Sequence, residues 1–270
     1  MNIDIKSYLA DDPRASVLLL HGLAEHHGRY SELIDALNAD GYDVYAYDQR
    51  GHGRAPGKRA VADVGGLIKD HLHARELVRG QSRTDDLFLF GHSMGGLATA
   101  ASALINPKNV TGVVLSGPAF APYSHIDVET IEKLQKLATV FPGAPVGLLD
   151  ASHVSRVPEV VADYENDPLN YHGPVPALTG MTMMVQGAET LKRAGQWTLP
   201  LLIFHGSEDM LANVDASWQF VAMATAAGAR AEMVEVPGAY HEVFNEPEAG
   251  MLTETMIAWM DQQLRGWSFY

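Results

Sequence analysis

Short apolar segments alternate with helical patterns along the first 117 residues, and this alternation limits the folds that are open to the chain. The apolar segments are rich in branched and aromatic side chains, as expected of strands buried on both faces. They span residues 15–22, 42–48, 86–91 and 110–117. Strict alternation with helices predicts right-handed crossovers, and therefore an α/β protein with a mostly parallel central sheet and helices on both faces.

The helical patterns lie between these segments at residues 30–41, at about 66–80 and after Ser93. In the first of them Leu33, Ile34 and Leu37 share one helical face, and Gly41 follows as a C-terminal cap. All three segments are predicted as helices.

The alternation stops between residues 118 and 197, where the chain is rich in Pro, Gly and Met. This part has helical patterns at 127–141 and 181–191, and the alternation resumes with the apolar segment 199–206. We therefore predict one α/β core, formed by residues 1–117 and 198–270, and an inserted, mainly helical cap at residues 118–197.

The composition excludes several classes of protein. The 270 residues include 19 Lys and Arg against 33 Asp and Glu, which gives a net charge of -14. Such a charge repels a phosphate backbone, so nucleic-acid binding is not expected. It also opposes docking on anionic lipid, although transient apolar contact of the cap with a membrane or lipid surface stays open.

The chain has no cysteine, which excludes disulfides, thiolate metal sites and a cysteine nucleophile. Residues 1–14 have neither the basic nor the apolar region of a secretory signal. No apolar stretch approaches the roughly 18 residues of a membrane-spanning helix. We expect a cytoplasmic protein that is at most peripheral to the membrane.

The turn from the apolar segment 86–91 to the next helix carries a serine between two glycines. Gly91-His92-Ser93-Met94-Gly95 matches the G-x-S-x-G nucleophile elbow of α/β-hydrolases. In such an elbow the serine hydroxyl is raised above the sheet at a helix N-terminus, where backbone N–H groups favour an oxyanion. Ser93 is therefore the predicted nucleophile.

A serine hydroxyl needs a base to activate it, and the base needs an acid to orient it. In this fold the chain order is serine, acid, histidine. His241 lies in the loop between the last predicted strand and the last helix, at the same sheet edge as Ser93, and is the predicted base. The acid should follow the segment 199–206, where Glu208 and Asp209 are adjacent. Spacing alone does not choose between these two.

Other histidines fit the chemistry less well. His71 and His73 lie two residues apart on a predicted helix and cannot share a face, so we expect them in solvent. His26 and His27 have no second group of ligands at a recognisable spacing, so no metal site is predicted. His205 precedes the two acids and has the wrong order for the base.

With these motifs placed, the chain resembles the monoacylglycerol lipases of the α/β-hydrolase superfamily, in particular their actinobacterial branch. The resemblance runs through most of the chain, and its motifs are HGLAEHHGRY, DQRGHGRAPGKR, GHSMGG, RVPEVVADYENDPLNYHGPVP, HGSEDML and YHEVFNEPE. The motif GHSMGG occurs in many hydrolases, whereas the cap stretch and YHEVFNEPE are far more specific.

The resemblance implies a catalytic triad of Ser93, Asp209 and His241, which selects Asp209 over Glu208. It also implies that the oxyanion is held by two backbone N–H groups. These belong to Leu23 and Met94.

Glu25 and Arg29 match positions that line the glycerol end of the site in this family. Their alternative role is an ion pair at i, i+4 that braces the oxyanion loop. The chain differs from mammalian members at Phe244, where they have a second histidine, and only one strand is predicted at the N-terminus where relatives have a pair.

The implied reaction is hydrolysis of the ester bond of monoacylglycerols to fatty acid and glycerol through an acyl-enzyme, with no cofactor and no metal. Alternatives on the same triad are a lysophospholipase, a broader carboxylesterase or an iminopeptidase-like amidase. A protein of the same fold that binds a ligand without turnover is a further alternative. Met181, Met183, Met184 and Val185 of the cap are expected either to line an acyl site or to pack the cap onto the core.

Overall fold

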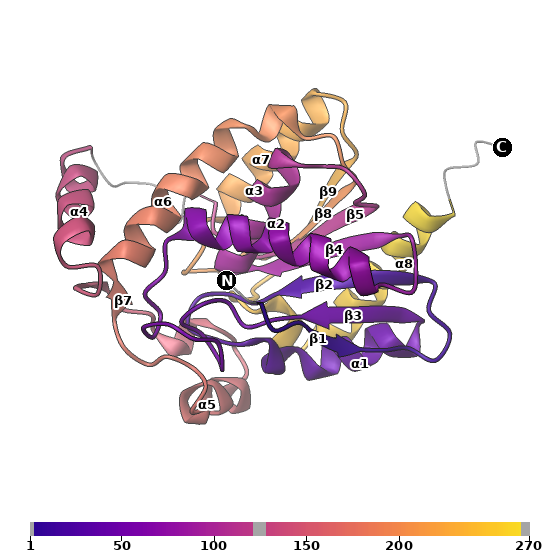
Figure 1. Ribbon diagram of the computed structural model, residues 1–270, viewed down its shortest axis with the longest axis horizontal. Helices are drawn as coiled ribbons and strands as arrows, with labels where there is room; N and C mark the ends of the chain where they lie inside the picture. Colours follow the sequence, from indigo (N-terminus) through magenta and orange to yellow (C-terminus); the bar gives the residue numbers. More distant parts are fainter. Residues whose placement is uncertain (1–2, 121–127, 266–270) are drawn as a thin grey trace.

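A seven-stranded sheet forms the centre of the computed structural model, which describes residues 3–120 and 128–265 (Figure 1). The strands are β1 (Lys6–Tyr8), β2 (Ala15–Leu20), β3 (Tyr42–Ala46), β4 (Leu87–His92), β5 (Gly112–Ser116), β8 (Leu201–Gly206) and β9 (Ala231–Val236). Their order across the sheet is β1-β3-β2-β4-β5-β8-β9. Only β1 runs antiparallel to its neighbour, so the N-terminal segment adds one edge strand, as the sequence predicts.

Helices cover both faces of the sheet, and each face has its own apolar core. On one face lie α1 (Ser31–Ala39) and α8 (Ala249–Leu264), and on the other lie α2 (Val64–Gln81), α3 (Ser93–Ile105) and α7 (Val214–Ala226). The central strands β2, β4 and β5 are buried along their whole length, because both of their faces contact helices. This is the mostly parallel sheet predicted from the alternation, and it agrees with the α/β-hydrolase fold that the resemblance implies.

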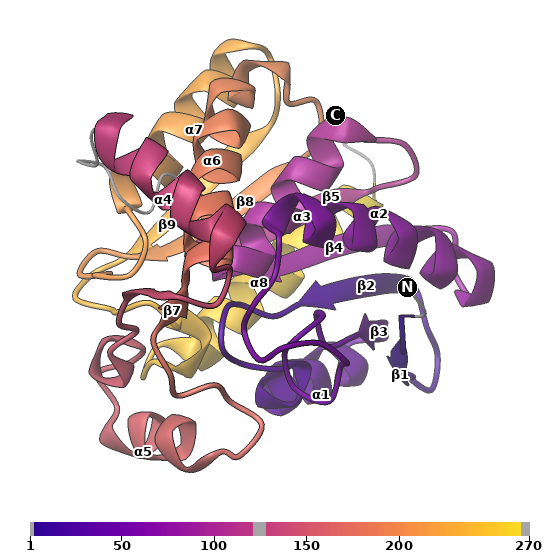
Figure 2. The ribbon, with the colours of Figure 1, turned by 60° about the vertical axis from the view of Figure 1, so that its left-hand side comes forward.

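The described residues between β5 and β8 correspond to the predicted cap and are called the insertion here, while the division into core and cap stays a prediction. The insertion contains α4 (Val128–Val140), β6 (Pro145–Gly147), η2 (Ala151–His153), α5 (Pro158–Asn166), β7 (Val175–Pro176), α6 (Ala177–Lys192) and η3 (Ala194–Gln196). It is mainly helical, with one short antiparallel pair that sequence periodicity did not indicate, β6 with β7. Figures 1 and 2 show α4 and α5 outside the sheet, at the end toward which the parallel strands point. Asp127, the first residue of the predicted helix 127–141, lies outside the described residues.

Helix α6 attaches the insertion to the core. Met183 is buried among core side chains, and the Thr179 hydroxyl accepts a hydrogen bond from the backbone N–H of Ala62 at 2.9 Å. The same hydroxyl donates to the carbonyl oxygen of Ala60 at 2.6 Å. Helix α6 therefore holds the insertion to the core by both apolar and polar contacts.

One sequence expectation is wrong. His71 is fully buried rather than solvated, and its Nδ1 lies 2.7 Å from the hydroxyl of Ser102 on α3. It shares a helical face with Leu67 and Ala74, which are also buried, so α2 presents this histidine to α3. His73, on the other side of the helix, is exposed as expected.

Two details of the helix ends refine the prediction. Helix α2 runs from Val64 to Gln81, a little longer than expected at both ends. Helix α1 is capped by Asp40, and Gly41 follows with φ = 79°. The positive φ explains why glycine stands there. Within the described residues, no helix is long and apolar enough to cross a membrane.

Candidate active site

The predicted elbow is present at the junction of β4 and α3. Ser93 has φ = 54°, a left-handed conformation that is strained for a non-glycine residue. A side chain at Gly91 would lie 2.5 Å from the hydroxyl of Thr99, and one at Gly95 would overlap the carbonyl oxygen of His21. Both glycines are therefore required by close packing, and the turn holds the partly exposed serine at the end of the sheet.

The acid and the base meet at the same edge of the sheet, in the loops after β8 and β9. His241 Nδ1 lies 2.7 Å from Asp209 Oδ2, and both side chains are almost completely buried. Asp209 Oδ1 accepts from the backbone N–H groups of Leu211 and Ala212 at 2.8 and 2.9 Å. Glu208 is exposed. Of the two adjacent acids, only Asp209 contacts the histidine.

The surroundings of His241 determine its charge. Burial opposes its protonation, but the charge of Asp209 and the hydrogen bond to it, helped by Glu242, raise the pKa of His241 above its ordinary value. The ring of His92 lies behind it, 4.7 Å away between centroids. Burial lowers the pKa of His92 to about 3, and its Nδ1 lies 3.0 Å from the hydroxyl of Ser116. His92 is thus a neutral neighbour that packs against the imidazole.

Ser93, His241 and Glu25 line one pocket. Among the described residues no hydrogen bond joins the Ser93 hydroxyl to His241. Contacts of this kind are often loose without substrate and tighten when substrate binds. A hydroxyl, an imidazole and a carboxylate in this order can generate an alkoxide nucleophile and return its proton to a leaving group.

The loop after β2 lies against the elbow. A side chain on Gly22 would come within 3.0 Å of Ser93 Cβ, so this loop passes directly beside the serine. Glu25 Oε1 accepts the Gly22 N–H at 2.5 Å. In the described part of the chain, no hydrogen bond occupies the backbone N–H of Leu23 or of Met94. These two groups are available to an oxyanion at Ser93.

Glu25 and Arg29 belong to a buried network of charges. Arg29 donates to Glu25 Oε2 at 3.0 Å and makes two hydrogen bonds, at 2.5 and 2.8 Å, to the carboxylate of Glu242. Tyr30 donates to Glu25 Oε1 at 2.7 Å, and the Arg29 guanidinium lies 4.7 Å above the Tyr164 ring. The ion pair expected at i, i+4 is therefore present, and it joins the oxyanion loop to the residue that follows His241.

Two cavities border these residues. The pocket at Ser93 holds only about 20 Å³ and is lined on the far side by Leu149, Val154, Tyr164 and Leu211, most of them from the insertion. This is room for about one water molecule. Met181, Met183, Met184 and Val185 do not line it, and the burial of Met183 fits the alternative that the methionines pack the cap onto the core.

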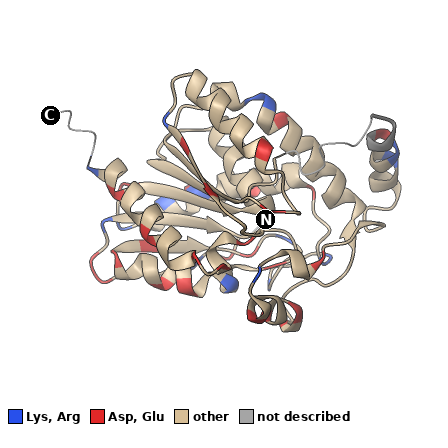
Figure 3. Cartoon of the chain, turned by 180° about the vertical axis from the view of Figure 1, so that it is seen from behind, with Lys and Arg blue, Asp and Glu red and all other residues tan. Residues whose placement is uncertain are grey.

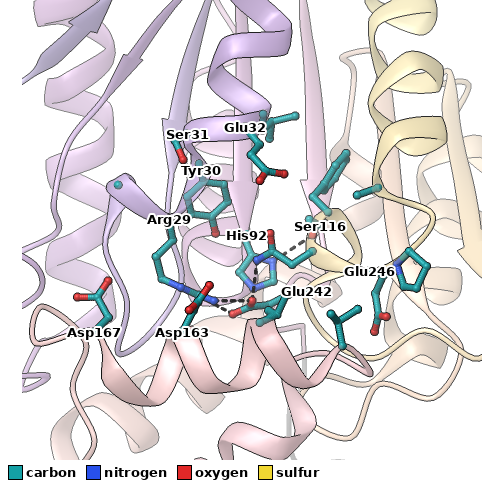
Figure 4. Close-up of a pocket in the computed structure, with 18 residues that line it drawn as sticks. Arg29, Tyr30, Ser31, Glu32, His92, Ser116, Asp163, Asp167, Glu242 and Glu246 are labelled. Atoms are coloured by element: carbon teal, nitrogen blue, oxygen red, sulfur yellow. Dashed lines mark hydrogen bonds and ion pairs between the residues drawn. The ribbon is translucent and has the colours of Figure 1, made fainter.

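A second cavity of about 530 Å³ lies on the other side of the charge network (Figure 4). His92 and Glu242 line both cavities and therefore lie between this one and Ser93. Arg29 lines the second cavity only. Asp163 of α5 and Phe244 both line it. Phe244 is the position at which mammalian relatives are expected to carry a second histidine, and here it belongs to the wall of this cavity.

His26 and His27 have separate partners. His26 Nε2 lies 2.8 Å from Asp167 in the insertion, and His27 Nδ1 lies 2.6 Å from Asp48. The described residues contain no group of three or more His, Asp and Glu side chains that could hold a metal ion.

Sequence reasoning missed three side chains that contact the site. His205 lies 3.0 Å from Asp209, Glu242 pairs with Arg29, and Tyr164 borders the pocket with its hydroxyl buried and without a hydrogen-bond partner among the described residues. The only signal for Glu242 was its place next to His241. Tyr164 lies more than a hundred residues from the loop that it contacts, and no local pattern indicates such a contact.

A protein-family model described as "Serine aminopeptidase, S33" matches residues 11–248. The monoacylglycerol lipase of Mycolicibacterium smegmatis is 37% identical over 254 residues, which cover 94% of this chain and 90% of that protein. The monoglyceride lipase of Rattus norvegicus is 30% identical over 87% of this chain and 77% of its own length.

A solved structure of similar shape is the crystal structure of Paleococcus ferrophilus monoacylglycerol lipase. It has a TM-score of 0.87 and 30% sequence identity, and the match covers 97% of this chain and 100% of that one. The fold, the family match and these relatives agree. The chain belongs to the serine aminopeptidase S33 family of α/β-hydrolases, in the branch that contains the monoacylglycerol lipases.

Proposed function

We propose that this protein hydrolyses the ester bond of monoacylglycerols through an acyl-enzyme on Ser93. The observation that carries the proposal is that Ser93, with φ = 54°, lines the same pocket as His241. The Nδ1 of His241 is bound to Asp209. The names of the relatives supply the class of substrate.

In the proposed mechanism His241 takes the proton of Ser93 as the serine oxygen attacks the ester carbonyl. The N–H groups of Leu23 and Met94 bind the oxyanion, and loss of one such donor typically costs about 3 kcal/mol of transition-state stabilisation. Asp209 fixes the imidazole tautomer and stabilises the imidazolium. Glycerol leaves with the proton, and a water molecule activated by His241 releases the fatty acid.

The two residues predicted at the glycerol end receive different roles. Glu25 lines the pocket of Ser93 and keeps one acceptor position on Oε2, since a carboxylate oxygen accepts two hydrogen bonds. We assign to it the contact with a glycerol hydroxyl. Arg29 lies behind Glu25 with its guanidinium committed to Glu25 and Glu242, so it supports this contact rather than making it.

Exposed apolar side chains support contact of the insertion with lipid. Val140, Phe141 and Leu148 are 65%, 64% and 85% exposed; the first two lie at the end of α4, and Leu148 follows β6. Side chains of this kind partition into the interface of a bilayer. We propose that this part of the insertion contacts the lipid surface from which the substrate is taken. The cytoplasmic location stays a prediction.

A fluorophosphonate probe tests the assignment of the nucleophile. We expect stoichiometric labelling of the wild-type protein, with the label on Ser93 in the tryptic peptide, and no labelling of Ser93→Ala. Labelling on another residue, or an unlabelled but folded wild-type protein, would contradict the proposed acyl-enzyme.

A further inference from the structure

The carboxylate of Asp209 is bound by two histidines. Its Oδ2 lies 2.7 Å from His241 Nδ1 and 3.0 Å from His205 Nε2. Since Oδ1 accepts two backbone N–H groups, the carboxylate is held by four donors. His205 is the fifth residue of β8 and is completely buried, and it lines neither of the cavities near Ser93.

The partners of His205 define its protonation at one nitrogen. Nε2 lies near Asp209 Oδ2 and, at 3.3 Å, near the carbonyl oxygen of Ala212. Both partners only accept hydrogen bonds, so Nε2 carries a proton. Nδ1 lies 2.9 Å from the hydroxyl of Ser217 on α7, which is also completely buried. The ring is thus held between the end of a strand and a helix of the core.

We propose that His205 is a positioning residue for the reaction, which orients the carboxylate of Asp209 toward His241 and limits its basicity. The inference rests on the proposed triad. A second donor on Oδ2 fixes the rotation of the carboxylate and shares its negative charge. The imidazole of His241 then stays oriented toward Ser93, and its pKa is raised less than an Asp209 without this donor would raise it.

The electrostatics of Asp209 agree with this geometry. Burial opposes its ionisation, but the charge of His241 and the hydrogen bonds from His205 and His241 hold the pKa of Asp209 well below its ordinary value. Other groups also act on His241, and each experiment below leaves them in place. They are His92 behind its ring, Glu25 from the oxyanion loop, and Glu242 with its partner Arg29.

Three substitutions of His205 distinguish the effect of its hydrogen bond to Asp209 from the effect of the volume that its ring fills. His205→Met fills similar space and donates nothing. The amide of His205→Gln reaches the position of Nε2 and can donate to Asp209, whereas the amide of His205→Asn reaches only the position of Nδ1. Asn is therefore the matched control for Gln. Thermal unfolding identifies any variant that fails to fold.

We expect Met and Asn to lower kcat about ten- to a hundredfold, the effect of losing a hydrogen bond to a charged group. KM should change little, because His205 lies outside the pocket. In the pH profile of kcat/KM, the acid limb is the fall in rate at low pH, where His241 becomes protonated. This limb should move to higher pH, because a carboxylate with one donor fewer raises the pKa of His241 further. Gln should restore both kcat and the position of the limb.

Two results would overturn the inference. One is a wild-type kcat and limb in folded His205→Met or His205→Asn. The other is an equal loss in Gln and Asn with the limb unmoved, since His205 would then serve only to pack. If Met does not fold, the comparison of Gln with Asn decides.

The pH dependence of fluorophosphonate labelling repeats the test without any choice of ester. Wild-type protein that is not labelled on Ser93 would overturn the proposed function itself. If the wild-type protein is labelled on Ser93 but the acid limb of labelling has the same pH in the variants, only the role of His205 is overturned.

Discussion

The adjacent acids Glu208 and Asp209 differ in burial and in contact with His241. Asp209 has a fully buried side chain bonded to His241, whereas Glu208 is exposed. We predict that Asp209→Asn lowers kcat by about 10⁴-fold, because an amide favours the wrong imidazole tautomer. Glu208→Gln is the matched control and should leave kcat nearly unchanged. Steady-state rates on a soluble ester measure both, and the reverse order of effects would show that the acid is misassigned.

Glu25 allows a test of the glycerol contact. Glu25→Gln should reduce kcat/KM for a monoacylglycerol about tenfold more than for a nitrophenyl ester, because only the former leaves a polar group unpaired in the pocket. Loss of equal size on both esters would mean that Glu25 only braces the oxyanion loop through Gly22.

At single positions, the sequence predicted the residues whose role depends on a local motif. Ser93 and its glycines could be found because the elbow is a local turn, and His241 because chain order limits the choice. His205, Glu242 and Tyr164 could not be found, since their contacts join segments that only the fold brings together. The burial of His71 could have been predicted from its spacing to Leu67 and Ala74.

Among the elements, the strands of the core were the most predictable, because burial on both faces demands continuous apolar runs. The insertion was less so. Its strands β6 and β7 are two or three residues long and have no periodicity to detect. Met183 and Val185 lie on one helix, yet one is buried and the other exposed, so the apolar pattern did not show that α6 packs on the core and does not line the pocket.

The loop after β2 and the loop after β9 are joined by the charges of Glu25, Arg29 and Glu242. Burial opposes ionisation of Glu242, but Arg29 lowers its pKa to about 2, so this pair is charged at neutral pH. We predict that Arg29→Met lowers the free energy of unfolding by about 3–5 kcal/mol, because it leaves buried carboxylates without their counter-charge.

The double variant Arg29→Met/Glu242→Gln should recover much of that loss, since it removes one of the two stranded charges. Urea unfolding of the two single variants and the double variant measures the coupling. Additive effects would show that the two side chains stabilise the loops independently.

Over the whole molecule, acidic residues outnumber basic ones and lie on many surface elements, including α5 (Figure 3). A lipid surface that this protein contacts should therefore be uncharged overall, and the contact apolar. We predict that Phe141→Ser/Leu148→Ser weakens sedimentation with phosphatidylcholine vesicles about tenfold, the scale of losing two partly buried apolar side chains.

The same double variant should retain its rate on a dissolved short-chain ester. Leu9→Ser/Ile105→Ser is the control, because both side chains are 53% exposed but belong to the core rather than to the insertion. Vesicle binding that falls equally in both double variants, or in neither, would contradict contact through the insertion.

The release of fatty acid from a panel of esters tests the central proposal most directly. Wild type and Ser93→Ala are compared on a monoacylglycerol, the matching diacylglycerol and a lysophospholipid of the same acyl chain. A diacylglycerol brings an acyl chain to Glu25 and strands a buried polar group, so we predict kcat/KM for the monoacylglycerol to be about ten- to a hundredfold higher. Ser93→Ala should be inactive on all three. Faster cleavage of the lysophospholipid or the diacylglycerol, or activity that survives in Ser93→Ala, would contradict a monoacylglycerol hydrolase acting through this serine.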